Sequence, residues 1–149
     1  MRELEQKKIV FKTHSYVNTD AISGMEVASV LNEDPNYVFK TLVTIGKSGN
    51  HFVFLVPVNR ELNLKKAAKT VGEKSISMVK QAELLLLTGY IHGGCSPVGM
   101  KKLFKTVIDE SASSYDKIIF SGGKIGYQIE TTLSELKKAI SFILGDISE

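Results

Sequence analysis

The 149-residue sequence lacks the features of membrane-spanning and secreted proteins. It contains no uninterrupted apolar run of about 18 residues, the length that a spanning helix needs. Its first residues, MRELEQKKIVFK, are charged and lack the apolar centre of a signal peptide. We therefore expect a protein of the cytoplasm that has no membrane partner.

Cysteine and histidine are also scarce. Cys95 is the single cysteine, so neither an internal disulfide nor a cysteine-based zinc cluster can form. The three histidines, His14, His51 and His92, form no HxH or HxxxH pair, which is the spacing typical of metal ligands. We expect neither a metal nor a cofactor.

The length favours a single domain over residues 1–149, and a 43% share of hydrophobic residues is enough for a core. The formal charge of +3 is only weak support for an anionic partner. Two groups of lysines could face a phosphate backbone, although ordinary solvated lysines are the simpler interpretation: Lys65, Lys66 and Lys69, and Lys101, Lys102 and Lys105.

Short helical and strand-like segments alternate along the chain. Helices are expected over 2–8, 22–31, 63–71 and 79–87, and from Thr132, which has capping-box spacing to Glu135. Strands are expected over 9–16, 75–78, 103–108, 117–120 and 127–129. The runs VFKTLVTIG and HFVFLVPV, joined by KSGN, predict a hairpin that is apolar on both faces and therefore central in its sheet. The pattern favours an α/β or α+β fold with a mixed sheet that curls toward a barrel.

Lys40 is the first candidate functional residue. It lies within the first strand of the predicted hairpin, where its strand neighbours are apolar on either face. An ammonium group in such surroundings needs a partner, because its charged form is poorly solvated there. The alternative is that this face opens to water and that Lys40 simply extends outward.

Glycine pairs form a second candidate feature, because glycine lets backbone N–H groups approach a ligand closely. Gly93-Gly94 and Gly122-Gly123 each follow a possible strand, but neither has the pattern of a nucleotide-binding loop. Taken alone, each is more typical of a tight turn.

Cys95 is a candidate nucleophile only by residue type. A catalytic thiol needs a base and surroundings that favour the thiolate, and His92 lies three positions away in a glycine-rich loop of unpredictable geometry. A buried, unreactive cysteine is the preferred interpretation.

Four segments taken together, VFKTLVT, LVPVNRELNLKKAAKTVG, TGYIHGGCSPVG and IIFSGGKIGYQI, resemble the YbaK/EbsC family of aminoacyl-tRNA deacylases. The resemblance runs in register from about residue 9 to residue 140. It implies a mixed sheet curled into a partly open barrel with short helices around it, the fold of the editing domain of many bacterial prolyl-tRNA synthetases. It also implies that the tRNA 3′ acceptor end is a partner, and prolyl-tRNA synthetase a candidate one.

The resemblance assigns the central functional role to Lys40. Residues implied to bind the substrate are Tyr16, Thr41, Gly93, Gly94, Ser96, Pro97, Gly99, Ser121, Gly122, Gly123 and Gln128. Gln128 departs from the family, because many members carry an acidic residue at that position. A neutral amide can neither act as a base nor pair ionically with Lys40.

The activity implied is removal of cysteine from Cys-tRNA(Pro), with Cys-tRNA(Cys) as a second substrate. The substrate's own thiol would attack its ester, so the protein would supply positioning and charge stabilisation. Lys40 would hold the ester and ribose, while backbone N–H groups of Gly93-Gly94 or Gly122-Gly123 would stabilise the oxyanion. Three alternatives stay open: an alanine-specific or other aminoacyl-tRNA deacylase of the same fold, a non-catalytic module that binds tRNA or a synthetase, and a thiol hydrolase using Cys95.

Overall fold

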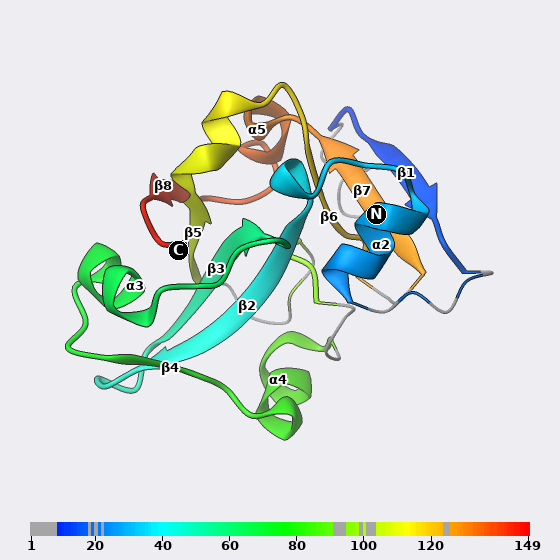
Figure 1. Cartoon of the computed structure of the whole chain (residues 1–149). Coiled ribbons are helices and arrows are strands. Elements are labelled where there is room, and N and C mark those ends of the chain that lie inside the picture. The colour runs from blue at the N-terminus through cyan, green and yellow to red at the C-terminus, as the bar shows by residue number, and fades with distance from the viewer. Residues whose placement is uncertain are drawn as a thin grey trace.

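The computed structural model describes residues 9–17, 19, 21, 23–90, 95–98, 100, 104–123 and 126–149. Within them, strands and short helices alternate and build two sheets (Figure 1). Every helix among these residues falls short of the length and apolar character needed to cross a bilayer. The helix expected over 2–8 lies outside the described residues.

The larger sheet has five strands in the described part of the chain, in the order β4-β2-β3-β5-β8. Its centre is the hairpin of β2 (Phe39–Gly46) and β3 (His51–Pro57), whose turn includes Gly49 at a φ of 92°. The prediction of a central hairpin is confirmed. The remaining strands are β4 (Ile76–Met78), β5 (Lys105–Asp109) and β8 (Ile143–Gly145).

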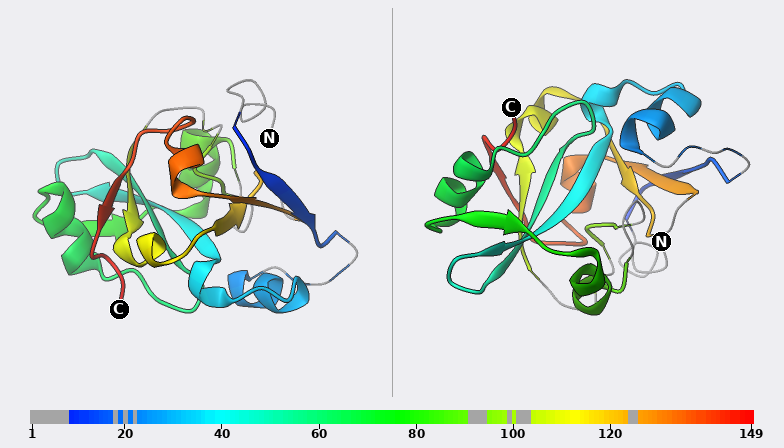
Figure 2. Two further views of the ribbon diagram at one scale, coloured as in Figure 1. Left: turned by 90° about the horizontal axis from the view of Figure 1, so that it is seen from above. Right: turned by 60° about the horizontal axis from the view of Figure 1, so that its bottom comes forward.

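The smaller sheet has the order β1-β7-β6 and is antiparallel: β1 (Lys12–Ser15), β7 (Tyr127–Thr131) and β6 (Ile118–Ser121). A parallel bridge between Val38 and Ile119 joins the two sheets where β2 begins. The sheets curve toward each other but do not close a barrel (Figure 2), which agrees with the mixed, partly open architecture expected.

Helices cover the sheets and set the ends of the strands: α2 (Gly24–Val30), α3 (Leu64–Val71), α4 (Gln81–Thr88) and α5 (Leu133–Leu136), with short 3-10 turns η1 (Pro35–Tyr37) and η2 (Glu110–Ser114). Helix α2 begins with a capping box between Ser23 and Glu26. At α5 only half of the expected box forms. Thr132 accepts from the Glu135 N–H, whereas the Glu135 carboxylate accepts from Val10 N–H instead.

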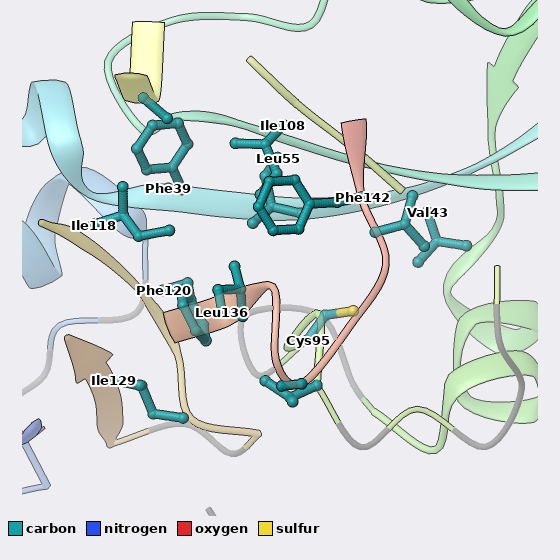
Figure 3. Close-up of a cluster of buried hydrophobic side chains, with 14 of the residues drawn as sticks. Phe39, Val43, Leu55, Cys95, Ile108, Ile118, Phe120, Ile129, Leu136 and Phe142 are labelled. Carbon is teal, nitrogen blue, oxygen red and sulfur yellow. The ribbon is translucent and has the colours of Figure 1, made fainter. Parts of the chain in front are cut away.

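Alternation along β3 divides the core into two layers. Val53 and Leu55 pack with residues of the smaller sheet, including Phe120 and Ile129 (Figure 3). The opposite face, with Phe54 and its neighbours, packs against α3 and the C-terminal segment. Both faces of β3 are therefore buried, whereas Lys40, Thr41 and Leu42 in the first half of its partner strand β2 are only partly buried.

Candidate functional site

A hollow of about 370 Å³ opens between the two sheets, beside the first half of β2. The start of α2, the segment from the end of β4 into α4, the end of β6 and the start of β7 also contribute to its wall, together with Val58 and Cys95. Apolar side chains make up most of this wall: Met25, Val27, Val38, Phe39, Leu42, Val43, Val58, Met78, Val79 and Leu84. No sequence pattern predicts that these residues come together, because they belong to five separate segments.

Lys40 lies in the wall of the hollow, and it is the only Lys or Arg among the described residues there. Its side chain is 27% exposed, and its Nζ is 3.5 Å from Oε1 of Glu61, whose side chain is 80% exposed. The sequence left two interpretations open, a partnered lysine or one extending into water. The structure shows a half-buried lysine at a cavity with a long, exposed ion pair, which leaves its ammonium group free to take a stronger acceptor.

Thr41, Ser121 and Gln128 line the same hollow as Lys40. The register of β6 and β7 places Ser121 directly opposite Gln128, so these two side chains share one face of the smaller sheet. Two atoms here are enclosed and have no hydrogen-bond partner in the described part of the chain, Thr41 Oγ1 and Gln128 Oε1. Unmet polar groups in a cavity wall suggest that a ligand supplies the partner.

Other residues implied by the resemblance lie elsewhere. Tyr16 is not among the lining residues, but it is buried with Ala21 and with Val27, which does line the hollow, and its hydroxyl also lacks a described partner. Ser96 is buried and its Oγ accepts from the Val98 N–H, so it shapes a local turn together with Pro97. The adjacent Cys95 reaches the hollow. Gly93, Gly94 and Gly99 lie outside the described residues, as does His92.

The amides of Gly122 and Gly123 are already engaged. Gly122 N–H donates to the Tyr127 carbonyl at 3.0 Å, and Gly123 N–H donates to Ser121 Oγ at 3.2 Å. An oxyanion could use either amide only if these turn contacts broke. Their part in transition-state stabilisation therefore stays a prediction without geometric support here.

Cys95 is buried in the core cluster that also contains Val43 and Phe142 (Figure 3). Burial raises the pKa of its thiol to about 12, although a hydrogen bond with Thr88 opposes part of that rise. A thiol with so high a pKa is almost entirely protonated near neutral pH and is a poor nucleophile. The structure thus agrees with the interpretation of Cys95 as a core residue.

A charged network adjoins the hollow on the smaller sheet. His14 Nε2 is 3.0 Å and Lys117 Nζ is 3.2 Å from Glu130 Oε1, and Lys117 Nζ is also 3.5 Å from Glu33 Oε2. Burial alone would raise the pKa of Glu130, but hydrogen bonds from His14 and Lys117 outweigh it and lower that pKa. His14, Glu33 and Glu130 bring potential metal ligand atoms within 4.8 Å of one another, yet the Lys117 ammonium already supplies the positive charge between the two carboxylates.

Comparison with known proteins agrees with this architecture. The family model of the aminoacyl-tRNA editing domain matches residues 19–139. The chain is 45% identical over 131 residues to an Enterococcus faecalis protein provisionally named Cys-tRNA(Pro)/Cys-tRNA(Cys) deacylase EbsC. The aligned residues are 87% of this chain and 80% of that protein.

Two further matches are a longer protein and a solved structure. The proline–tRNA ligase of Thermosipho melanesiensis is 31% identical over 117 residues, which are 78% of this chain but 20% of the ligase. A crystal structure provisionally described as a trans-editing enzyme for prolyl tRNA synthetase superposes with a TM-score of 0.85 at 24% identity, over 99% of this chain and 93% of the other. At that identity the structural match establishes the fold alone. With the family model spanning most of its length, the chain belongs to the aminoacyl-tRNA editing domain family.

Proposed function

We propose that this protein hydrolyses the ester bond of mischarged tRNA in trans, with Cys-tRNA(Pro) as the main substrate and Cys-tRNA(Cys) as a second one. The observation that carries the proposal is the position of Lys40, the cation in the described wall of an otherwise mostly apolar hollow. The name of the 45% identical relative supports the same substrates. Residues 1–149 are proposed to act as one editing domain in the cytoplasm.

The reaction uses the substrate's thiol as the nucleophile. Its sulfur attacks the carbonyl carbon of the same aminoacyl ester, an S–C bond forms, and the C–O bond to the terminal ribose breaks. The thiol proton ends on the released ribose hydroxyl. Water then opens the cyclic thioester and yields free cysteine.

The chain's own residues favour this route over a protein nucleophile. Cys95, the only cysteine, is buried with a pKa of about 12. Lys40, which lines the hollow, would hold the ester oxygen and the ribose, where negative charge develops as the bond breaks. The apolar walls hold the acyl group close to its reactive geometry and exclude water.

A deacylation panel tests the substrate assignment. Purified protein is given cysteinyl, alanyl and seryl esters of tRNA(Pro), and release of each amino acid is followed over time. We expect rapid loss of cysteine and slow loss of alanine, which has no side-chain nucleophile. Rapid hydrolysis of the alanyl ester would instead assign the protein to the alanine-removing class, in which water attacks directly. Binding of the tRNA without turnover would support a non-catalytic module.

Prolyl-tRNA synthetase is the proposed protein partner. A segment similar to this chain forms about a fifth of two proline–tRNA ligases, so such a segment and the ligase occur in one protein there. The same deacylation assay on a mixture of Cys-tRNA(Pro) and Cys-tRNA(Cys), with and without added synthetase, tests whether the partner directs tRNA choice.

A further inference from the structure

The side-chain amide oxygen of Gln128 is enclosed and accepts no hydrogen bond in the described structure. The residue lies on β7 opposite Ser121, is 6% exposed and lines the hollow. Its Oε1 has no hydrogen-bond partner in the described part of the chain. Buried amide oxygens in folded proteins almost always accept a hydrogen bond, so a partner from a bound ligand is expected.

Neighbouring groups do not meet this need. His14 lies directly across from Gln128 on β1, and Glu130 lies two residues along the same face of β7. These two side chains hydrogen-bond to each other at 3.0 Å, and Lys117 holds the same carboxylate oxygen. The charged network is therefore complete without Gln128.

The composition of the hollow restricts what the ligand's donor can be. None of the described lining residues is Asp or Glu, whereas Lys40 contributes a positive charge. An ammonium group in this hollow would find no lining carboxylate and would be repelled by Lys40. An uncharged amine suits the hollow better, because its N–H can donate to a neutral oxygen.

We propose that Gln128 determines specificity by accepting a hydrogen bond from the unprotonated α-amino group of the substrate's acyl moiety. The inference rests on the proposed function and specifies how the same site recognises its substrate. Among the other donors of a cysteinyl ester, the thiol S–H is weak and the ribose hydroxyl lies on the side assigned to Lys40. The torsion that turns the terminal amide of glutamine is broad, so a bound amine can recruit Oε1 at little cost.

Two esters that differ only in the α-amino group test the proposal. tRNA(Pro) is charged with cysteine or with 3-mercaptopropionate, both of which keep the thiol needed for self-attack. The value of kcat/KM for each is divided by that ester's spontaneous hydrolysis rate in the same buffer. The wild type should favour the cysteinyl ester by about tenfold, which is the worth of one hydrogen bond.

Variants identify the residue that accepts the hydrogen bond from the α-amino group. Gln128→Met, which preserves length without an amide, and Gln128→Leu should each bring the preference close to one. Thr41→Val tests the rival assignment, because Thr41 Oγ1 is the other enclosed atom without a described partner in the wall. Only the ratio between the two esters is compared for this variant, whatever its rate, and that ratio should stay at the wild-type value if Gln128 accepts from the amine. Thermal melts identify which of the two Gln128 variants is folded.

Three results would overturn the inference. One is a wild type that shows no preference, as expected if Gln128 reads the ribose; another is an unchanged preference in a folded Gln128 variant. The third is loss of preference in Thr41→Val alone. A wild type that hydrolyses neither ester would overturn the proposed function as well, so the two failures can be told apart.

Discussion

Individual residues at this site carry sharply different chemical capacities. Lys40 and Cys95 both reach the hollow, but Lys40 is partly solvated, whereas Cys95 is 7% exposed and belongs to the core. From the sequence, both residues are candidates for a catalytic role. The difference in their exposure to solvent shows which of them can contact a ligand. The cysteine contributes to packing, and the lysine side chain is exposed enough at the hollow to contact a ligand.

Cys95 should prove dispensable for catalysis. Cys95→Ala is expected to keep deacylation within a few-fold of wild type while lowering the melting temperature slightly, because a small buried side chain is truncated. With a pKa of about 12, roughly one thiol in ten thousand is ionised at pH 8, so iodoacetamide should label the folded protein very slowly. The same reagent on protein in denaturant is the control. A folded but inactive Cys95→Ala would require a protein nucleophile.

Among the elements, the smaller sheet links the site to the rest of the molecule through charges. The carboxylate of Glu130 on β7 contacts His14 from β1 and Lys117 from the segment before β6. Lys117 also forms an ion pair with Glu33, which follows α2. The residues come from four segments that the sequence does not relate, so no pattern in the chain could predict this network. Two of its residues, His14 and Glu130, lie on the same face of the smaller sheet as Gln128.

Stability should therefore fall in mild acid through Glu130. Its folded-state pKa is below the ordinary 4.5, so its contribution is fully present above about pH 4.5 and is lost as the pH falls through the folded value. Glu130→Gln should be less stable than wild type at pH 7 and should lose less stability between pH 5 and pH 3. Urea unfolding at each pH measures this, with the exposed Glu83→Gln as control. Equal acid sensitivity of Glu130→Gln and wild type would contradict the role assigned to the network.

At the scale of the whole molecule, local signals predicted the elements better than their assembly. The hairpin, the αL stop of α3 at Gly72 and the cap of α5 at Thr132 all follow from residues close together in sequence. Strand β8 was missed, because Ile143–Gly145 is only three residues long and forms through parallel pairing with distant β5. The first lysine group shows the same limit: Lys66 binds Asp146 and the Ser148 carbonyl, so it secures the C-terminal segment and is not simply a phosphate contact. Lys101 and Lys102 of the second group lie outside the described residues.

The hollow is the clearest product of assembly. Four of its polar residues, Lys40, Thr41, Ser121 and Gln128, were named from the sequence through a family resemblance, whereas Ser23 was not. Its apolar wall exists only because both sheets and two helices meet there. The sequence identifies Lys40 as a charged residue among apolar strand neighbours. It does not show which side of β2 opens to a cavity.

The most direct measurement compares single-turnover deacylation of Cys-tRNA(Pro) by the wild type, Lys40→Ala and Lys47→Ala. Lys47 follows β2 in the exposed hairpin turn and serves as a matched lysine away from the hollow. Lys40→Ala should lose about 10²-fold or more in rate, comparable to removing a transition-state donor, with its melting temperature nearly unchanged. Lys47→Ala should match the wild type. A folded Lys40→Ala variant that hydrolyses Cys-tRNA(Pro) at the wild-type rate would contradict the account.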